Sequence, residues 1–235
     1  MKKFLTILTL AALTSISAAD QAADRVLSQV RHMTTLQKND LKGTLRKKGK
    51  RTPIALFLRG QNIQFQFYKD KKWEKFHMRL KDKEFDLFEI KNGKSFKFSN
   101  QKISQPIMET DLTYEDLAFR FLYWPNAKIE GTETIKTQKC HKIRIENPSK
   151  SGKYGIVYVW VHQKHGALMQ VTGYDRKGKI LKRFHVTALM SVGKTQTLKK
   201  MNVEQYNPAT GKVSGITFME FSKPTPVKAK PKGLR

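Results

Sequence analysis

The most reactive side chains in this sequence stand in pairs that do not meet the requirements of a catalytic or metal site. Cys140 and His141 offer a thiol and a base, but neighbours on a strand point to opposite faces and cannot hydrogen-bond as a nucleophilic dyad. His162 and His165 would supply two metal ligands, yet no third ligand is evident near them. The sequence therefore favours solvated histidines in a turn.

Two further patterns resemble functional motifs but depart from them. The Gly-Lys-Thr run at 193–195 ends like a phosphate-binding loop, but Ala188 replaces the first glycine of that motif and no helix follows. Glu115 and Asp116 are adjacent acids at a predicted helix start, where capping and the helix dipole explain them without an acid–base role. We therefore predict a protein that is not an enzyme, and we predict no metal site and no cofactor.

A helix from Thr113 to Trp124 is the most distinctive element of a strand-rich chain. Thr113 is a good N-cap, Asp116 stands at the capping-box distance, and Pro125 ends the run. Apolar side chains recur at three- and four-residue spacing, which predicts a helix that lays an aromatic face on another part of the protein. These side chains are Tyr114, Leu117, Phe121 and Trp124. Aromatic residues at this spacing are also typical of an ordinary core, and that alternative stays open.

The rest of the chain reads as one more helix and a series of short strands. The segment Asp20 to Leu36 predicts an amphipathic helix with Ala23, Val26, Leu27, Val30 and Met33 on one side. Elsewhere the hydrophobic pattern alternates with period two, and basic or Gly/Asn turns separate the runs, as in an antiparallel meander. The predicted strands are Leu41–Arg46, Pro53–Arg59, Asn62–Tyr68, Trp73–Met78, Phe85–Lys91, Ser95–Phe98, Ala127–Lys136, Cys140–Glu146, Gly155–His162, Ala167–Tyr174, Ile180–Leu189, Thr197–Tyr206 and Gly215–Phe221.

So many short strands cannot form one flat sheet, and we expect them to curl into a barrel or half-barrel. The fold class is mainly β with two or more helices, an incomplete antiparallel β-barrel with a helical lid. Two helices are too few to cover such a sheet on both faces, which places them at its concave side or mouth. A helix that simply plugs the core is the equal alternative. The side chains expected to point inward are Ile63, Phe65 and Phe67; Ile156, Tyr158 and Trp160; and Leu45 with Phe57.

The order of elements resembles the LolA-like family of exported carriers, in particular the subgroup of outer-membrane lipoprotein-sorting proteins. The resemblance is carried by the Asp-Leu-Thr-Tyr-Glu-Asp-Leu run at 111–117 and by landmarks at 158–161, 173–179 and 200–201. It implies an incomplete antiparallel β-barrel around an apolar cavity, with helices as its lid. It also implies binding of acyl chains of lipoproteins or lipids, or alternatively an envelope-stress sensor or scaffold that binds a partner protein.

In the classical lipoprotein carrier an arginine on an early strand holds the lid shut. Arg59 is the nearest candidate in this sequence, but the residues around it do not match, so that role is not carried over. Met169 is an adaptable side chain suited to irregular acyl chains. The predicted cavity and lid contacts are Phe57, Phe65, Phe67, Tyr114, Leu117, Phe121, Trp124, Tyr158, Trp160 and Met169.

The two ends of the chain differ from its middle. Residues 1–19 have the basic start, apolar run and small-residue end of a secretory signal of Gram-negative type, which predicts a periplasmic protein. Residues 20–222 form the expected carrier domain. Residues 223–235 are a Pro/Lys tail expected to be disordered. The single cysteine, Cys140, cannot form an internal disulfide and is expected to be buried and inert.

The charge of the chain suggests a polyanionic partner. The formal net charge is +27, and it stays strongly positive after Lys2 and Lys3 are removed with the signal. An exported protein seldom meets nucleic acid, so we expect no nucleic-acid partner. The partners expected are a lipid or lipidated protein, an anionic membrane surface and partner membrane proteins. The alternative is that the charge reflects a basic proteome or habitat.

Overall fold

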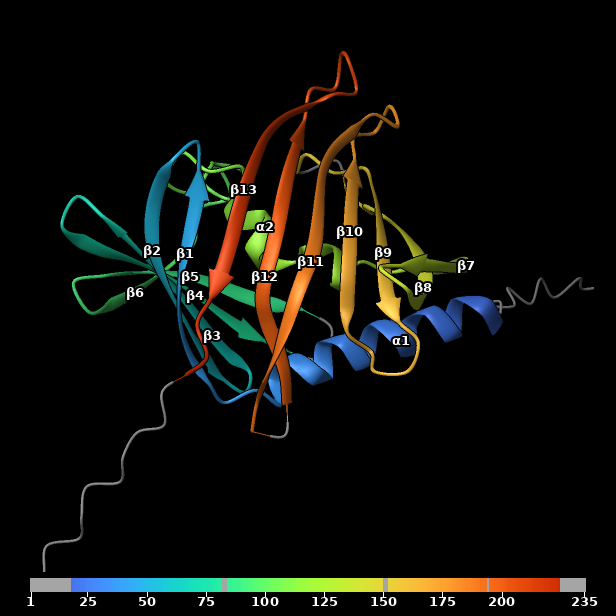
Figure 1. Cartoon of the computed structure of the whole chain (residues 1–235), viewed down its shortest axis with the longest axis horizontal. Coiled ribbons are helices and arrows are strands. Elements are labelled where there is room, and N and C mark those ends of the chain that lie inside the picture. The colour runs from blue at the N-terminus through green and yellow to red at the C-terminus, as the bar shows by residue number, and fades with distance from the viewer. Residues whose placement is uncertain (1–17, 82–83, 150–151, 194, 225–235) are drawn as a thin grey trace, which may run out of the picture.

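One antiparallel sheet of thirteen strands dominates the computed structural model, which describes residues 18–81, 84–149, 152–193 and 195–224 (Figure 1). The strand order is β6-β5-β4-β3-β2-β1-β13-β12-β11-β10-β9-β8-β7, so β6 and β7 are free edges and the sheet is not closed. The elements are α1 (Ala18–Thr35), β1 (Asp40–Lys47), β2 (Lys50–Arg59), β3 (Asn62–Lys69), β4 (Lys72–Leu80), β5 (Phe85–Lys91), β6 (Lys94–Lys97), α2 (Tyr114–Ala118), the 3₁₀ helix η1 (Arg120–Tyr123), β7 (Lys128–Ile135), β8 (Gln138–Glu146), β9 (Ile156–His162), β10 (Leu168–Tyr174), β11 (Ile180–Val192), β12 (Thr195–Tyr206) and β13 (Val213–Phe221).

Tight turns explain why consecutive strands pair. In the turns at 48–49, 70–71 and 92–93 both central residues have positive φ, the geometry of the type I′ turns whose twist matches that of paired strands. Each predicted strand overlaps one observed strand, and the prediction of a mainly β fold built on one antiparallel sheet that does not close is confirmed. The predicted signal falls almost wholly in 1–17 and the predicted tail in 225–235, and both of these segments lie outside the described residues.

The first helix, α1, lies against one face of the sheet, which we call the inner face (Figure 1). Ala23, Leu27 and Val30 are buried there, as the amphipathic pattern predicts, but Met33 is 38% exposed and does not join this face. No helix in the described part of the chain is both long enough and apolar enough to cross a membrane.

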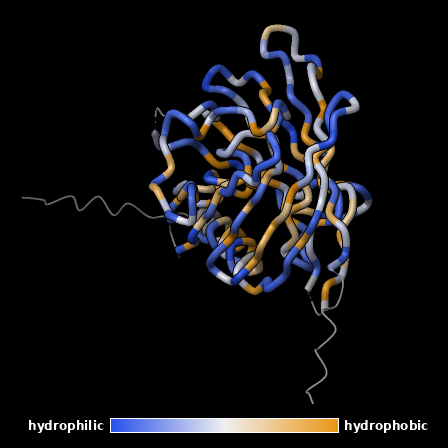
Figure 2. The backbone as a smooth tube through the Cα atoms, turned by 90° about the vertical axis from the view of Figure 1, so that its left-hand side faces the viewer, coloured by the Kyte–Doolittle hydropathy of each residue, from blue (hydrophilic) through white to orange (hydrophobic). Residues whose placement is uncertain are grey.

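The inner face carries the main core. Phe65 and Phe67 of β3 belong to it together with Leu56 of β2, and the predicted inward direction of β3 is confirmed. Figure 2 shows apolar and polar stretches interleaved along the chain, as expected for strands with one buried face.

Two predictions of strand facing are wrong. On β9 the side chains in the main core are Val157, Val159 and Val161, so Tyr158 and Trp160 lie on the opposite, outer face. On β2 the core residues are Ile54, Leu56 and Leu58, so Phe57 also lies on the outer face. β9 is apolar at nearly every position, and such a run does not reveal which alternate set points inward.

A small second cluster covers part of the outer face. Its buried members are Cys140, Trp160 and Met169. The indole N–H of Trp160 donates to Glu133 at 2.9 Å, and Lys142 lies over the rings of both Tyr158 and Trp160. Cys140 is fully buried, and burial raises the pKa of its thiol, which confirms the expected buried cysteine.

Candidate functional site

The candidate site is the inner face together with the segment that covers it, residues 99–124, which we call the central segment. This segment leaves the sheet after β6 and returns to it at β7. It folds back on itself through backbone hydrogen bonds from Ile107 to Leu112 at 2.7 Å and from Glu115 to Ile103 at 2.8 Å. The segment is therefore locally ordered without being a strand of the sheet.

The helix within it begins as predicted. Thr113 is the N-cap and its hydroxyl accepts the N–H of Asp116 at 3.3 Å, while the Asp116 carboxylate accepts the N–H of Thr113 at 2.7 Å. This reciprocal pair is a capping box closed by aspartate in place of the usual glutamate. The predicted capping role of Thr113 and Asp116 is confirmed.

The predicted single helix from Thr113 to Trp124 is wrong. The α-helix ends after one turn, Phe119 takes a left-handed conformation with φ 44°, and a 3₁₀ turn follows. The Phe119 ring packs edge-on against Phe121 at 5.6 Å and lies 6.4 Å from Phe184 of β11. The helix thus breaks at Phe119, whose left-handed backbone is strained, and at this break the Phe119 ring packs against the sheet.

The central segment fills the inner face. Leu117 and Phe121 are almost fully buried in the main core, and the Tyr114 ring packs 5.3 Å from Phe76 and 4.8 Å from Phe98. The pocket beside Tyr114 has a volume of only about 10 Å³, room for about one water molecule and far too small for an acyl chain. In this conformation the segment itself fills the space over the inner face.

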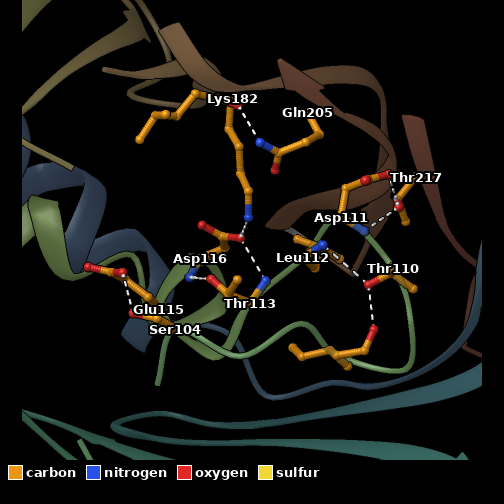
Figure 3. Close-up of polar contacts among 12 residues, drawn as sticks. Ser104, Thr110, Asp111, Leu112, Thr113, Glu115, Asp116, Lys182, Gln205 and Thr217 are labelled. Carbon is orange, nitrogen blue, oxygen red and sulfur yellow. Dashed lines mark hydrogen bonds and ion pairs between the residues drawn. The ribbon is translucent and has the colours of Figure 1, made fainter. Parts of the chain in front are cut away.

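Asp116 ties the central segment to β11. Its side chain is completely buried, and Lys182 Nζ lies 2.5 Å from its Oδ2. The hydroxyl of Tyr154 donates to Oδ1 at 2.6 Å (Figure 3 shows the lysine contact). A buried charge is tolerated only when it is paired and hydrogen-bonded, and this carboxylate meets both conditions.

Tyr154 reaches this position because of a glycine. It stands in the β8–β9 connection, and its ring lies where a Cβ on Gly173 would stand, at 2.3 Å. Complete burial, with the Asp116 carboxylate adding to it, raises the pKa of Tyr154 well above its ordinary value. The phenol therefore stays protonated and remains a donor to Asp116.

Asp111 fixes the central segment to strands β1 and β13. Its carboxylate pairs with Lys47 at 2.6 Å. The same carboxylate accepts the hydroxyl of Thr217 at 2.8 Å, and the Asp111 backbone N–H donates to that Thr217 oxygen at 2.8 Å (Figure 3 shows both Thr217 contacts). A Cβ on Gly215 would lie 2.6 Å from the carboxylate, so glycine leaves the room for it. We call Asp111 and Asp116, with Lys47, Lys182, Tyr154 and Thr217, the latch.

Glu115 is buried beside the latch and forms no salt bridge with a described residue. The Ser104 hydroxyl donates to its carboxylate at 3.5 Å. Burial raises the pKa of Glu115 above its ordinary value, and the nearby Asp116 carboxylate raises it further. The expectation that Glu115 and Asp116 only secure the helix start is therefore too narrow, because Asp116 also anchors the segment to the sheet.

Two arginines, Arg59 and Arg31, differ in whether they contact the central segment. Arg59 forms an exposed pair with Asp40 at 2.5 Å, away from the central segment. Arg31 of α1 donates to the carbonyl oxygen of Leu122 and lies over the Tyr123 ring at 5.4 Å. It is thus α1, and not the early strand, that supplies an arginine contact to the central segment.

The structure divides the ten predicted site residues between two faces. Phe65, Phe67, Tyr114, Leu117 and Phe121 meet in the main core, and Trp124 packs against it partly buried. The other four lie on the outer face: Phe57, Tyr158, Trp160 and Met169.

Sequence reasoning missed the basic half of the latch. Lys182 alternates with Phe184 and Val186 on β11, so a lysine shares the core face of an apolar strand. That pattern was a usable signal, because a lysine is almost never fully buried unless it is paired. Nothing local to Lys47, Tyr154 or Thr217 marks them as partners of residues far along the chain.

Comparisons with known proteins identify the sequence family and the fold. Residues 62–230 match the model of a protein family described as "Uncharacterized protein". No curated protein matches the sequence.

Three solved structures are similar over most of the chain. A DUF1329 family protein from Desulfovibrio piger has a TM-score of 0.68 at 14% identity, covering 88% of this chain and 92% of that one. A structure named as an outer membrane lipoprotein-sorting protein domain, from Vibrio parahaemolyticus, has a TM-score of 0.67 at 14% identity and covers 87% of this chain and 92% of its own. A LolA superfamily protein from Nitrosomonas europaea has a TM-score of 0.60 at 13% identity and covers 88% of this chain and 93% of its own. At these identities the likeness establishes the fold, which is LolA-like.

Proposed function

Because the chain belongs to the family whose model matches residues 62–230 and has the LolA-like fold, we propose that it is a carrier for the acyl chains of lipoproteins or lipids. The proposed compartment is the periplasm, reached through the signal at 1–19, and the proposed carrier domain is 20–222. The carrier works by binding and release and needs no catalytic step.

One observation carries the proposal: the apolar inner face is covered by a segment that is not part of the sheet. Leu117 and Phe121 bury themselves there, while the long-range polar contacts described above for Asp111 and Asp116 join the segment to β1, β13, β11 and the β8–β9 connection. These contacts are made by side chains, so they can be broken together without loss of the backbone hydrogen bonds that pair the strands. The segment can therefore leave the inner face while the sheet persists.

Release of cargo requires such a competitor. Burying about sixteen methylenes is worth on the order of 10 kcal/mol, at about 0.8 kcal/mol each, so an empty matched cavity would not release its ligand. A segment that fills the inner face must be displaced first, and the apparent affinity falls by the fraction of molecules that are open. The proposed acyl contacts on the sheet are Phe65 and Phe67, and the side chains proposed to compete with the ligand for this face are Tyr114, Leu117, Phe121 and Trp124 of the central segment.

Ligand content is the first test. The protein is purified from the periplasm of a Gram-negative host and examined by native mass spectrometry and lipid extraction, and its binding to a fluorescent fatty acid is titrated. We expect bound acyl species and saturable probe binding. Protein that carries no acyl ligand and binds no probe contradicts the carrier function and leaves the alternative, binding of a partner protein by the same fold.

A reversible lock tests whether the segment must move. In the double variant D111C/G215C the new Sγ at 111 takes the place of Asp111 Cγ, which lies 3.1 Å from a Cβ at 215. An S–S bond of about 2.05 Å together with the Sγ–Cβ bond of the cysteine at 215 spans that separation, so the pair can form a disulfide between the central segment and β13. The oxidised protein should lose probe binding and the reduced protein should regain it. The reduced form of the same variant is the matched control, and equal binding by both forms argues against displacement.

A further inference from the structure

Four of the connections that leave one end of the sheet lie together at the top of Figure 1, and they are strongly basic. Because neighbouring strands are antiparallel, the connections β1–β2, β8–β9, β10–β11 and β12–β13 all emerge at this end (Figure 1, top). The turn at 47–50 reads Lys-Lys-Gly-Lys and the turn at 175–179 reads Asp-Arg-Lys-Gly-Lys, with Lys153 and Lys212 in the other two connections. We call this the hairpin end.

Three of these connections surround an open hollow. Its volume is about 410 Å³, and its lining combines Lys153, Arg176, Lys177 and Lys179 with Asp175, Pro208 and Ala209. The Arg176 guanidinium donates to the carbonyl oxygens of Ser149 at 3.2 Å and Gly152 at 3.3 Å, which fixes the β10–β11 hairpin to the β8–β9 connection.

The one acid in the hollow is engaged by the backbone. Asp175 Oδ1 accepts the N–H groups of Lys177 and Lys179, each at 2.8 Å. Within the described residues, Lys153, Lys177 and Lys179 form no salt bridge, and all three are exposed. The hollow thus gathers the ammonium groups of three exposed lysines that form no salt bridge with a described acidic residue.

The opposite end of the sheet does not show this pattern. Its described turns include Gly60-Gln61, Lys136-Thr137 and the 163–167 connection, in which Lys164 is the only lysine. Lys136 and Lys164 are exposed, so this end offers isolated charges of the same kind. Lys81, in the β4–β5 connection at this end, is paired with Glu84 and Asp86. Within the described residues, the closely spaced lysines without an acidic partner therefore lie at the hairpin end.

We propose that the hairpin end is a docking surface for an anionic phospholipid bilayer, with headgroup phosphates held in the hollow by Lys153, Arg176, Lys177 and Lys179. Charge complementarity supports this occupant: ammonium and guanidinium groups bind phosphate, and several of them act together at a charged surface. The proposal stands apart from the carrier function, because electrostatic docking needs no displacement of the central segment.

The docking surface also adjoins the latch. The β8–β9 connection that lines the hollow through Lys153 continues directly into Tyr154, the donor to Asp116. Lys47, in the β1–β2 turn, pairs with Asp111. Contact with a membrane at this end would therefore reach the two connections that hold the central segment.

Vesicle co-sedimentation tests the docking surface. The protein is mixed with vesicles of phosphatidylglycerol and phosphatidylcholine, or of phosphatidylcholine alone, at several salt concentrations. We expect binding to the mixed vesicles only, weakening as salt increases. The variant K177Q/K179Q should lower the partition coefficient roughly thirtyfold, since each lysine near an anionic surface is worth about fivefold. Its matched control, K136Q/K164Q, has the same net charge and should lower it less than about threefold if location matters.

Three results would overturn the proposal. Equal losses in the two double variants would show that net charge alone causes binding. Equal binding to phosphatidylcholine would show that anionic headgroups are not recognised. Backbone NMR shifts at 177 and 179 caused by inorganic phosphate, without vesicle binding, would assign the hollow to a soluble phosphate. Thermal unfolding of each variant verifies that the exposed substitutions leave the fold intact.

Discussion

Lys182 and Asp116 form an ion pair that is almost sealed from solvent: their charged atoms lie 2.5 Å apart and their side chains are 7% and 0% exposed. The lysine belongs to the middle of the sheet and the aspartate to the first turn of α2. Because Asp116 also closes the capping box of that helix, one carboxylate both starts the helix and fixes it to the sheet. Folding of α2 and docking of the central segment are therefore linked.

Replacing the lysine alone should be costly. K182M leaves the buried Asp116 carboxylate without its cation, and we expect a loss of about 3–5 kcal/mol in the free energy of unfolding, measured in urea. In the double variant K182M/D116N neither position carries a charge, so its loss should be smaller than that of K182M. K50M removes the fully exposed pair with Glu109 and serves as the control. A K182M protein as stable as the wild type would mean that the pair does not anchor the segment.

The sequence predicted the strands well, because a period-two pattern and tight turns are local signals. Each of the predicted runs became a strand, and Thr113 with Asp116 marked the helix start. The helix end was not predictable in the same way. The left-handed Phe119 packs against Phe184 of β11, a residue far along the chain, and a local pattern carries no information on such a contact.

The candidate site was predicted only in part for a related reason. The alternation on β3 identified its inner residues, but β9 is apolar on both faces, so Tyr158 and Trp160 were assigned to the wrong one. The partners of the two latch acids come from strands and connections distant in sequence. Only Lys182, a lysine among core positions, gave a sign of its role.

The Tyr154 hydroxyl is a second anchor that can be removed separately. Y154F deletes its hydrogen bond to the Asp116 carboxylate, and we expect a loss of about 1.5–3 kcal/mol in unfolding free energy, the range for a bond to a charged group. G173A should act on the same contact by pushing the ring out of its place. If the two effects share one contact, the double variant will lose less than the sum of the single losses. Additive losses would separate the ring position from the hydrogen bond.

Glu115 should make stability depend on pH. Burial raises the pKa of its carboxyl in the folded protein, so the folded state keeps its proton at pH values where the unfolded state has released it. The free energy of unfolding should therefore fall as pH rises from the ordinary glutamate range through the raised pKa. E115Q should remove this part of the dependence and be more stable than the wild type at neutral pH.

Urea unfolding at a series of pH values measures the effect of E115Q. The control is E84Q, which neutralises an exposed acid at the β4–β5 connection. An unchanged pH profile in E115Q, or a loss of stability at neutral pH, would show that the Glu115 carboxylate is well solvated or paired in the folded protein.

Phe121 gives the sharpest test of competition between the central segment and a ligand. The variant F121L reduces the apolar surface that the segment buries on the inner face, which should lower the stability of the closed state by about 1 kcal/mol. A less stable closed state leaves more molecules open, so the apparent affinity for a fluorescent fatty acid should rise about fivefold. Stability and ligand affinity thus change in opposite directions.

The matched control is W160F on the outer face. Trp160 is buried like the core residues of the central segment, and its indole N–H donates to Glu133. W160F removes this hydrogen bond and should therefore also lower stability. It lies outside the inner face, however, and should leave the affinity for the probe unchanged. Weaker probe binding in F121L would show that Phe121 forms part of the ligand-binding wall. Tighter binding in W160F would mean that any destabilisation opens the protein, and the specific role of the central segment would then be lost.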